Sequence, residues 1–359
     1  MVWNRIIGQE RPLTLLRNAL RTQRLAHAYL FAGPPNVGKT TVALALAQTL
    51  NCLDPVDETQ GCGTCRSCRK IAHGNHPDVR VVNPGQMERS AASTVASRAS
   101  ISIEQVREVE VDAHYRPLEG RRKVYIFESA EQMTVSAANA LLKILEEPPR
   151  TVLFVLTSAN PAALLSTIRS RCQEVPFGLV PAETIREALE QRRQVPPQRA
   201  QVLATLAAGR VGRAFALAAE ERFVARREQV YALAEQVLSC PPVRALQAAE
   251  QILTWAEEEG KQENRALLVE EFLELLLVWF RDLLVWRETH SREMLINRDE
   301  AERVSRCAEL GSSARWQQCV RAVQLARQQL QRQANAQLAL EVLMLTLSGN
   351  WEKGLRTES

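Results

Sequence analysis

A glycine-rich stretch near the N-terminus has the residue types and spacing of a phosphate-binding loop. It reads G-x-x-x-x-G-K-T, with an apolar run before it and a helix-forming run after it. The two glycines allow consecutive backbone N–H groups to curl around phosphate oxygens, the lysine reaches the β- and γ-phosphates, and the threonine hydroxyl binds Mg²⁺. A chance glycine-rich turn is the alternative. The residues expected to bind nucleotide are Gly33, Pro34, Pro35, Asn36, Val37, Gly38, Lys39, Thr40 and Thr41.

Four cysteines soon after this loop have the spacing of metal ligands. Cys62, Cys65 and Cys68 are separated by two residues each, and Cys52 precedes them in the order C-x9-C-x2-C-x2-C. This spacing points several thiolates at one centre, and four thiolates complete a tetrahedral shell around Zn²⁺. We therefore expect a structural zinc rather than a catalytic one. Reduced thiols without a metal, or a redox pair, are the alternatives.

A second stretch, residues 122–131, bears on whether bound nucleotide would be hydrolysed. In a working P-loop ATPase of this kind the strand ends in an aspartate that holds Mg²⁺, and a glutamate then orients the attacking water. Here those positions are Glu128 and Ser129. Serine cannot take a proton from water as a carboxylate does, so we predict nucleotide binding with weak or absent hydrolysis. The alternative is that Glu131 acts as the base, although it would lie beyond the strand.

A parallel sheet would position these groups. Short apolar runs precede both the loop and Glu128, and helix-forming segments lie between the runs, which predicts an α/β fold whose sheet is covered by helices on both sides. Ser158 ends one run, where a hydroxyl can meet a γ-phosphate. Residues 84–100 are small and polar and are predicted to form a loop. The predicted strands are 28–31, 79–82, 122–127, 151–158 and 173–177.

Composition sets the broad class. The chain has 359 residues, of which 46% are hydrophobic and 24% charged, which favours a globular protein of about two or three domains. A net charge of +4 permits a surface that faces nucleic acid but does not require one. The N-terminus lacks the apolar core of a signal peptide and no apolar run is long enough to cross a bilayer. We therefore expect a cytoplasmic protein.

The second half of the chain reads as helical. Residues 268–284 are apolar around the whole helix circumference, which predicts a helix buried in a helical domain or between subunits. We expect a nucleotide-binding domain at 1–178 with the cysteine insertion at about 52–68, a small helical lid at 179–219, and a helical domain at 220–359. Arg210 or Arg213 could reach a nucleotide from the lid, and an ordinary solvated arginine is the alternative.

These motifs together resemble the bacterial clamp-loader branch of the AAA+ ATPases. The resemblance covers roughly the first 215 residues. It rests on Gly8-Gln9, the run His27–Phe31 into the P-loop, the four cysteines, the run Ala137–Pro149, which reads A-A-N-A-L-L-K-I-L-E-E-P-P, and Ser170-Arg171-Cys172.

The resemblance implies roles for several of these residues. The four cysteines would bind structural zinc, Ser158 would take the sensor-1 position, and Arg171 would be an arginine finger presented to ATP on a neighbouring subunit. The implied fold is an AAA+ P-loop NTPase domain with a zinc insertion, a small helical lid and a C-terminal all-α collar. Through such a collar the subunits of the family form a ring.

The departures distinguish between relatives. The motor subunit, gamma or tau, carries Asp-Glu where this chain has Glu128-Ser129, so the pattern favours the delta-prime type, a subunit of DNA polymerase III, itself a nucleotidyltransferase. Such a subunit would assemble with gamma/tau and delta so that the loader opens the sliding clamp and loads it on primed DNA, with sparse contacts to DNA phosphates. The alternatives are the gamma/tau motor and a stand-alone P-loop motor enzyme. Whether ATP and Mg²⁺ occupy the loop stays open.

Overall fold

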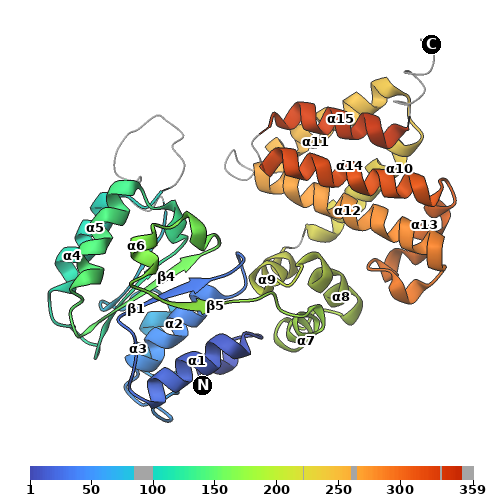
Figure 1. The fold of residues 1–359 in the computed structure, drawn as a ribbon. Coiled ribbons are helices and arrows are strands. Elements are labelled where there is room, and N and C mark those ends of the chain that lie inside the picture. The colour runs from blue at the N-terminus through green and yellow to red at the C-terminus, as the bar shows by residue number, and fades with distance from the viewer. Residues whose placement is uncertain (85–99, 221, 260–264, 332–333, 350–359) are drawn as a thin grey trace. The chain divides into compact units, whose positions relative to one another are not determined.

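The computed structural model describes residues 1–84, 100–220, 222–259, 265–331 and 334–349 (Figure 1). Most of the loop predicted at 84–100 lies outside the described residues. Contacts divide the chain into two compact units, Met1–Ala188 with Ala207–Ala214, and Leu189–Leu206 with Phe215–Ser359. The residues predicted to form a lid, 179–219, are therefore shared between the two units.

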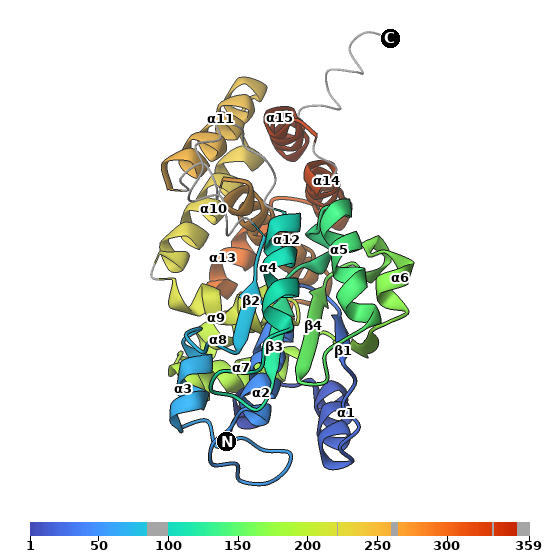
Figure 2. The same cartoon turned by 90° about the vertical axis from the view of Figure 1, so that its left-hand side faces the viewer.

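The first unit is built on a five-stranded parallel sheet, as predicted. The strand order is β2-β3-β4-β1-β5, and all neighbours are parallel. Strands β2, β3, β4 and β1 can be followed side by side in Figure 2. Every residue of the three central strands is buried, because helices cover both faces. The strands are β1 (Ala28–Ala32), β2 (Val79–Val82), β3 (Lys123–Phe127), β4 (Val152–Ser158) and β5 (Gln173–Pro176).

Helices pack on both faces of this sheet (Figure 1), and the buried apolar residues form a separate cluster on each face. In β1, Tyr29 and Phe31 join one cluster and Ala28 and Leu30 join the other, since successive strand residues point to opposite faces. The first face is covered by α1 (Glu10–Arg21), α2 (Lys39–Leu50) and α3 (Arg66–Ala72), and the second by α4 (Ile103–Ala113), α5 (Val135–Glu146) and α6 (Ser166–Arg169). Short 3-10 helices are η1 (Trp3–Arg5), η3 (Ala130–Gln132) and η4 (Pro161–Ala163).

Local sequence signals set where these helices begin and end. The N–H of Gln105 donates to the Ser102 hydroxyl and the N–H of Ser102 donates to the Gln105 side chain, so α4 starts with a capping box. The Thr134 side chain accepts from the N–H of Ala137 and caps α5. The two prolines Pro148 and Pro149 prevent α5 from continuing.

The rest of the described chain is helical. Helix α12 packs against α10, α11, α13 and α14 and is the central element of the second unit. Trp279 and Phe280 on α12 are fully buried, and Trp279 stacks on Tyr231 with ring centroids 4.5 Å apart. The prediction of a buried helix here is therefore confirmed, while Trp286 is half-buried. No helix in the described part of the chain is long and apolar enough to span a membrane.

The remaining helices fall in two groups. The region predicted as a lid contains α7 (Ala182–Arg193), α8 (Pro197–Leu206) and α9 (Val211–Ala219). The C-terminal helices are α10 (Phe223–Leu238), α11 (Pro242–Glu259), α12 (Arg265–Thr289), α13 (Ala301–Ala308), α14 (Ser313–Gln331) and α15 (Ala336–Ser348), with short 3-10 turns η5 (Arg292–Met294) and η6 (Arg298–Glu300).

Candidate nucleotide and metal sites

The predicted P-loop connects β1 to the N-terminus of α2. Gly33 has φ +153°, and a Cβ there would lie 2.3 Å from the carbonyl oxygen of Phe177, so only glycine fits. Gly38 caps α2 with φ +101°, and a Cβ there would meet no atom within 4 Å. The space above the helix N-terminus is therefore open, and the unpaired N–H groups and dipole of α2 favour an anion there.

A cavity of about 350 Å³ lies over this loop. Because β4 lies between β1 and β3, the carboxyl ends of these three parallel strands meet at one edge of the sheet, and each supplies residues to the cavity. The volume is within the range of small-ligand pockets. The lining residues are Pro35, Asn36, Gly38, Lys39, Thr40, Thr41, Glu128, Ser129, Thr157, Ala159 and Gly212.

Lys39 is held against its own loop. Its Nζ donates to the carbonyl oxygens of Gly33 and Pro34, both at 2.6 Å, and the residue is only 8% exposed. Burial lowers the pKa of Lys39, and the carboxylate of Glu131 partly opposes that shift. The ammonium group is thus placed beside the loop, where it can contact a phosphate of a bound nucleotide.

Glu128 and Ser129 face the cavity from the end of β3. Among the lining residues that the structure describes, Glu128 contributes the one carboxylate. Ser129 has φ +50°, and its N–H donates to the Thr157 hydroxyl at 3.2 Å. The arrangement can therefore hold a metal-bound triphosphate, but no second carboxylate lines the cavity, within the described residues, to orient a water molecule.

Glu131, the alternative base, lies just outside the cavity lining. It lies in η3, as expected for a residue beyond the strand, and is absent from the cavity lining. Its Oε1 accepts the N–H of Ala159 at 3.0 Å, which fixes the loop after β4. Glu131 therefore acts here as a support for a residue that lines the cavity.

The hydroxyl at the end of β4 is one residue earlier than predicted. Ser158 is fully buried, and its Oγ accepts the N–H of Asn160 at 3.1 Å. Thr157 lines the cavity instead. Side chains alternate between the two faces of a strand, so a shift of one residue decides which hydroxyl reaches the site. Of these two hydroxyl residues, Thr157 is therefore the one that lines the cavity, and Ser158, which was expected there, does not.

The four predicted cysteines come together in one cluster. Their sulfur atoms lie within 4.8 Å of one another, and no histidine or carboxylate in the described residues joins them. The Sγ of Cys52 is 3.5 Å from that of Cys62 and 3.9 Å from that of Cys65. A tetrahedral zinc with bonds of about 2.3 Å requires sulfur atoms about 3.8 Å apart. The cluster therefore fits a four-coordinate metal ion.

Backbone N–H groups favour the thiolate form in part of this cluster. Burial alone raises the pKa of a thiol, and it raises the pKa of Cys52. At Cys62, the N–H groups of Thr64 and Cys65 donate to the sulfur at 3.4 and 3.3 Å. They outweigh burial and lower the pKa of Cys62 to about 6. The thiolate is the form that binds metals.

Buried polar contacts that the sequence analysis missed attach the cysteine segment to the sheet. His76 is 3% exposed, its Nε2 lies 3.1 Å from the Ser67 hydroxyl, and its Nδ1 accepts the N–H of Asp78. Asp78 in turn accepts three backbone N–H groups of the turn before β3, those of residues 118, 119 and 120. The same turn donates two N–H groups to Asn51, next to Cys52. The cysteine cluster and the strand that leads to Glu128 thus share a buried junction.

Arg171 lies outside the cavity of its own chain. Its guanidinium donates to Glu146 Oε1 at 2.7 Å and to the carbonyl of Thr167 at 3.0 Å, and about a third of the side chain is exposed. It follows α6, on the face of the sheet covered by α5. Arg171 is thus not among the described residues that line the cavity over its own P-loop.

Comparisons with known proteins agree with these features. A family model described as DNA polymerase III, delta subunit, matches residues 8–180, and one for the C-terminal part of that subunit matches residues 243–349. DNA polymerase III subunit delta' of Bacillus subtilis (strain 168) is 32% identical over 339 residues, which cover 94% of this chain and 96% of that protein. The tau subunit of Escherichia coli (strain K12) is 39% identical over 185 residues, which cover 52% of this chain but 27% of tau.

Among solved structures, a gamma-subunit-related protein of Thermotoga maritima overlaps 94% of this chain and 99% of its own, with 18% identity and a TM-score of 0.40. A TM-score that low does not by itself establish a shared fold. The parallel sheet and P-loop of the first unit, with the helical region that follows, define an AAA+ type P-loop protein of the clamp-loader class. The match to delta' over nearly the full length of both proteins specifies the branch. The chain belongs to the DNA polymerase III delta-prime family of clamp-loader subunits.

Proposed function

We propose that this protein serves the DNA polymerase III clamp loader as a subunit that binds ATP without hydrolysing it at an appreciable rate. The observation that carries the proposal is the composition of the cavity. It keeps the complete P-loop and Glu128, but it has Ser129 where a water-orienting carboxylate would stand. Loss of that one group removes the general base while leaving the phosphate contacts in place.

The residues of the cavity have distinct roles in this proposal. The backbone N–H groups of residues 33–38 and the N-terminus of α2 would bind the phosphates, Lys39 would neutralise the β- and γ-phosphates, and Thr40 with Glu128 would hold Mg²⁺. The Thr157 hydroxyl would contact the γ-phosphate. Bound nucleotide would therefore act as a structural ligand.

The catalytic contribution of the chain is proposed to be Arg171, supplied to ATP bound on a neighbouring gamma or tau subunit. A guanidinium group placed against the γ-phosphate stabilises the charge that develops on the transferred phosphoryl group. Glu146 would hold the side chain in reach, because a bound carboxylate limits the rotamers of a long arginine.

Family membership supports the remaining parts of the proposal. The four cysteines would bind a structural zinc, since a closed shell of four thiolates leaves no position for a substrate. The division at 178 and 219 would separate the nucleotide-binding domain, the lid and a helical collar. Through that collar the chain would join gamma/tau and delta in the cytoplasm, where the loader opens the sliding clamp and loads it on primer-template DNA.

Replacement of Arg171 by alanine tests the proposal. In a loader reconstituted with clamp and primed DNA, Arg171→Ala should lower ATP turnover at the site it completes by on the order of 10³-fold. The total ATP turnover of the loader should therefore fall at least by the fraction that this one site contributes. Arg169→Ala, which removes an exposed arginine two positions earlier, is the matched control and should leave turnover unchanged.

Assembly is checked by size-exclusion chromatography of both reconstituted loaders. If the Arg171→Ala loader assembles normally and turns over ATP like the Arg169→Ala loader, the finger role is refuted.

The intact P-loop favours a second candidate function, that of the ATP-hydrolysing motor subunit itself. That candidate predicts turnover by the purified chain, which Lys39→Ala would abolish.

A further inference from the structure

Gln9 links the N-terminal segment to the P-loop. It directly precedes α1 and is only 8% exposed. Its amide nitrogen donates to the carbonyl oxygen of Val37 in the loop at 3.3 Å and to that of Gly178 at 2.7 Å, and its amide oxygen accepts the N–H of Gly178 at 3.2 Å. Gln9 is not among the described residues that line the cavity over the loop. The roles assigned to the cavity residues therefore do not explain it.

The surroundings of this amide fix its orientation. Two carbonyl oxygens face its nitrogen and one N–H group faces its oxygen, so a rotated amide would place its oxygen against both carbonyls. The backbone is held as well, because the carbonyl of Gln9 accepts the N–H of Leu13 at 3.1 Å and a Cβ at Gly8 would lie 2.9 Å from Val180. Gln9 is therefore a fixed point beside the loop.

The contact with Val37 determines which way the next N–H group of the loop points. In a trans peptide unit the C=O and N–H groups point in opposite directions. Gln9 holds the carbonyl of Val37, so the N–H of Gly38, which belongs to the same peptide unit, points away from Gln9. Because Gly38 lines the cavity, that N–H is available to a phosphate oxygen there.

Glycine at position 38 makes such a support necessary. Gly38 has φ +101°, and a flip of the peptide unit between Val37 and Gly38 would change this angle, which glycine tolerates at either sign. After a flip the carbonyl oxygen of Val37 would replace the N–H of Gly38 and would repel a phosphate. The residue that lets phosphate approach the backbone thus leaves this peptide unit without steric restraint, and the hydrogen bond from Gln9 supplies that restraint.

We propose that Gln9 is a positioning residue for phosphate binding. It fixes the peptide unit between Val37 and Gly38 so that the N–H of Gly38 faces the bound phosphates. The inference rests on the proposed role of the P-loop as a nucleotide site. Gln9 acts through the loop and does not touch the nucleotide.

This one peptide unit can be observed selectively by NMR. Gly38 and Gly212 are the two glycines of the chain that follow a valine. A chain labelled with ¹³C-carbonyl valine and ¹⁵N-glycine therefore gives two carbonyl–amide correlations, and Val211→Ile assigns them by removing that of Gly212. In the nucleotide-free parent chain the Val37–Gly38 unit should give one sharp correlation. A doubled or exchange-broadened correlation would contradict a fixed peptide unit.

Gln9→Met keeps the length of the side chain but removes its hydrogen bonds. It should shift or broaden the Val37–Gly38 correlation. It should also lower the affinity for a non-hydrolysable ATP analogue, measured by isothermal titration calorimetry, by about tenfold or more, because the N–H of Gly38 no longer faces the phosphate in every molecule. Gln9→Glu keeps the acceptor for the N–H of Gly178 but offers no N–H to Val37, so it should behave like Gln9→Met.

Gln105→Met is the matched control. Gln105 is 4% exposed, and its amide accepts the N–H of Ser102 at 2.9 Å and donates to the carbonyl of Asn83 at 3.0 Å. Its replacement removes the same kinds of hydrogen bond on the face of the sheet that α4 covers, so it should change neither the correlation nor the affinity. Circular dichroism verifies that each variant is folded.

The outcomes separate this inference from the proposed function. A parent chain that does not bind the analogue would refute the proposed function. If the parent chain binds it and both Gln9 variants bind it equally well, the role of Gln9 alone is overturned. A shifted correlation with unchanged affinity would also contradict that role. If neither Gln9 variant folds, the sharpness of the Val37–Gly38 correlation in the parent chain decides.

Discussion

Single residues decide what the nucleotide site can do. Lys39, Thr40, Glu128 and Ser129 line one cavity. In the proposed function the first three would bind phosphate and Mg²⁺, and Ser129 would stand where the water-orienting carboxylate is missing. The motif for the loop was readable from the sequence because it is local. The choice of Thr157 over Ser158 was not, because it depends on which face of β4 meets the cavity, and that is set by packing across the whole sheet.

Lys39→Ala is expected to weaken binding of a non-hydrolysable ATP analogue to the purified chain by about 10- to 100-fold. The change removes charge-assisted contacts to the phosphates, which are each worth about 1.5–3 kcal/mol. Isothermal titration calorimetry measures the effect. Lys143→Ala, which removes an exposed lysine of α5, should bind the analogue like the parent chain. If the two variants bound the analogue with equal affinity, Lys39 would have no role in binding the phosphates.

The cysteine cluster provides a second prediction at this scale. Cys65→Ser should abolish stoichiometric zinc in the purified protein, because serine replaces a thiolate with a much weaker ligand for this metal. Since metal binding is coupled to local folding, amide hydrogen exchange in residues 52–72 should rise at the same time. Cys240→Ser, outside the cluster, is the control and should retain zinc. A parent protein without zinc would refute the assignment.

At the scale of elements, the strands and helices followed from the pattern of apolar residues. The predicted strands match β1 to β5 within a residue or two. What escaped prediction is the set of contacts between elements distant in sequence. The junction of His76, Asp78 and Asn51 with the turn before β3 joins residues about 40 to 70 positions apart, and only the fold brings them together.

Asp78 makes this junction testable. Burial alone would raise the pKa of Asp78, but three backbone N–H donors outweigh it and hold the pKa below the ordinary value of 3.8. Because the folded state favours the carboxylate, its stabilising contribution is fully present above pH 3.8 and declines as the pH falls through the lower pKa of the folded state.

Asp78→Asn should therefore destabilise the turn at neutral pH by about 1–3 kcal/mol, since the amide nitrogen cannot accept the N–H groups of the turn. Amide hydrogen exchange at residues 118–120 should show faster opening. Asp54→Asn, at an exposed position, should not change it. The difference between parent and Asp78→Asn should shrink at acid pH, and a constant difference down to the acid limit would argue against the role of the carboxylate.

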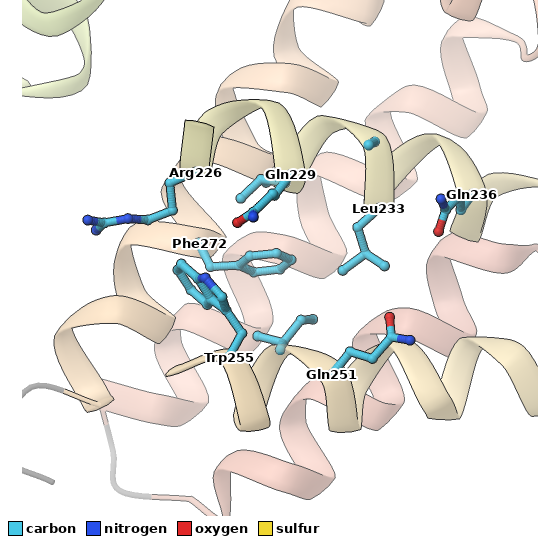
Figure 3. Close-up of a pocket in the computed structure, with 10 residues that line it drawn as sticks. Arg226, Gln229, Leu233, Gln236, Gln251, Trp255 and Phe272 are labelled. Carbon is cyan, nitrogen blue, oxygen red and sulfur yellow. The ribbon is translucent and has the colours of Figure 1, made fainter. Parts of the chain in front are cut away.

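At the scale of the whole molecule, the chain combines a P-loop unit with a helical region, and the match to delta' extends over 94% of it. Family membership was accessible from the sequence because several specific motifs occur in order along one chain. An apolar groove between α10, α11 and α12 (Figure 3), lined in part by Leu233 and Phe272, was not, because its residues come from three helices and no motif marks them. For the same reason, the sequence predicted that this region is helical but not which of its helices contact one another.

The central claim, that the chain keeps a phosphate cradle without the group that activates water, is tested most directly by ATP turnover of the purified chain alone. The account predicts steady-state turnover equal to that of Lys39→Ala, with or without DNA, even at ATP concentrations that saturate the loop. Turnover above that background, abolished by Lys39→Ala, would contradict it.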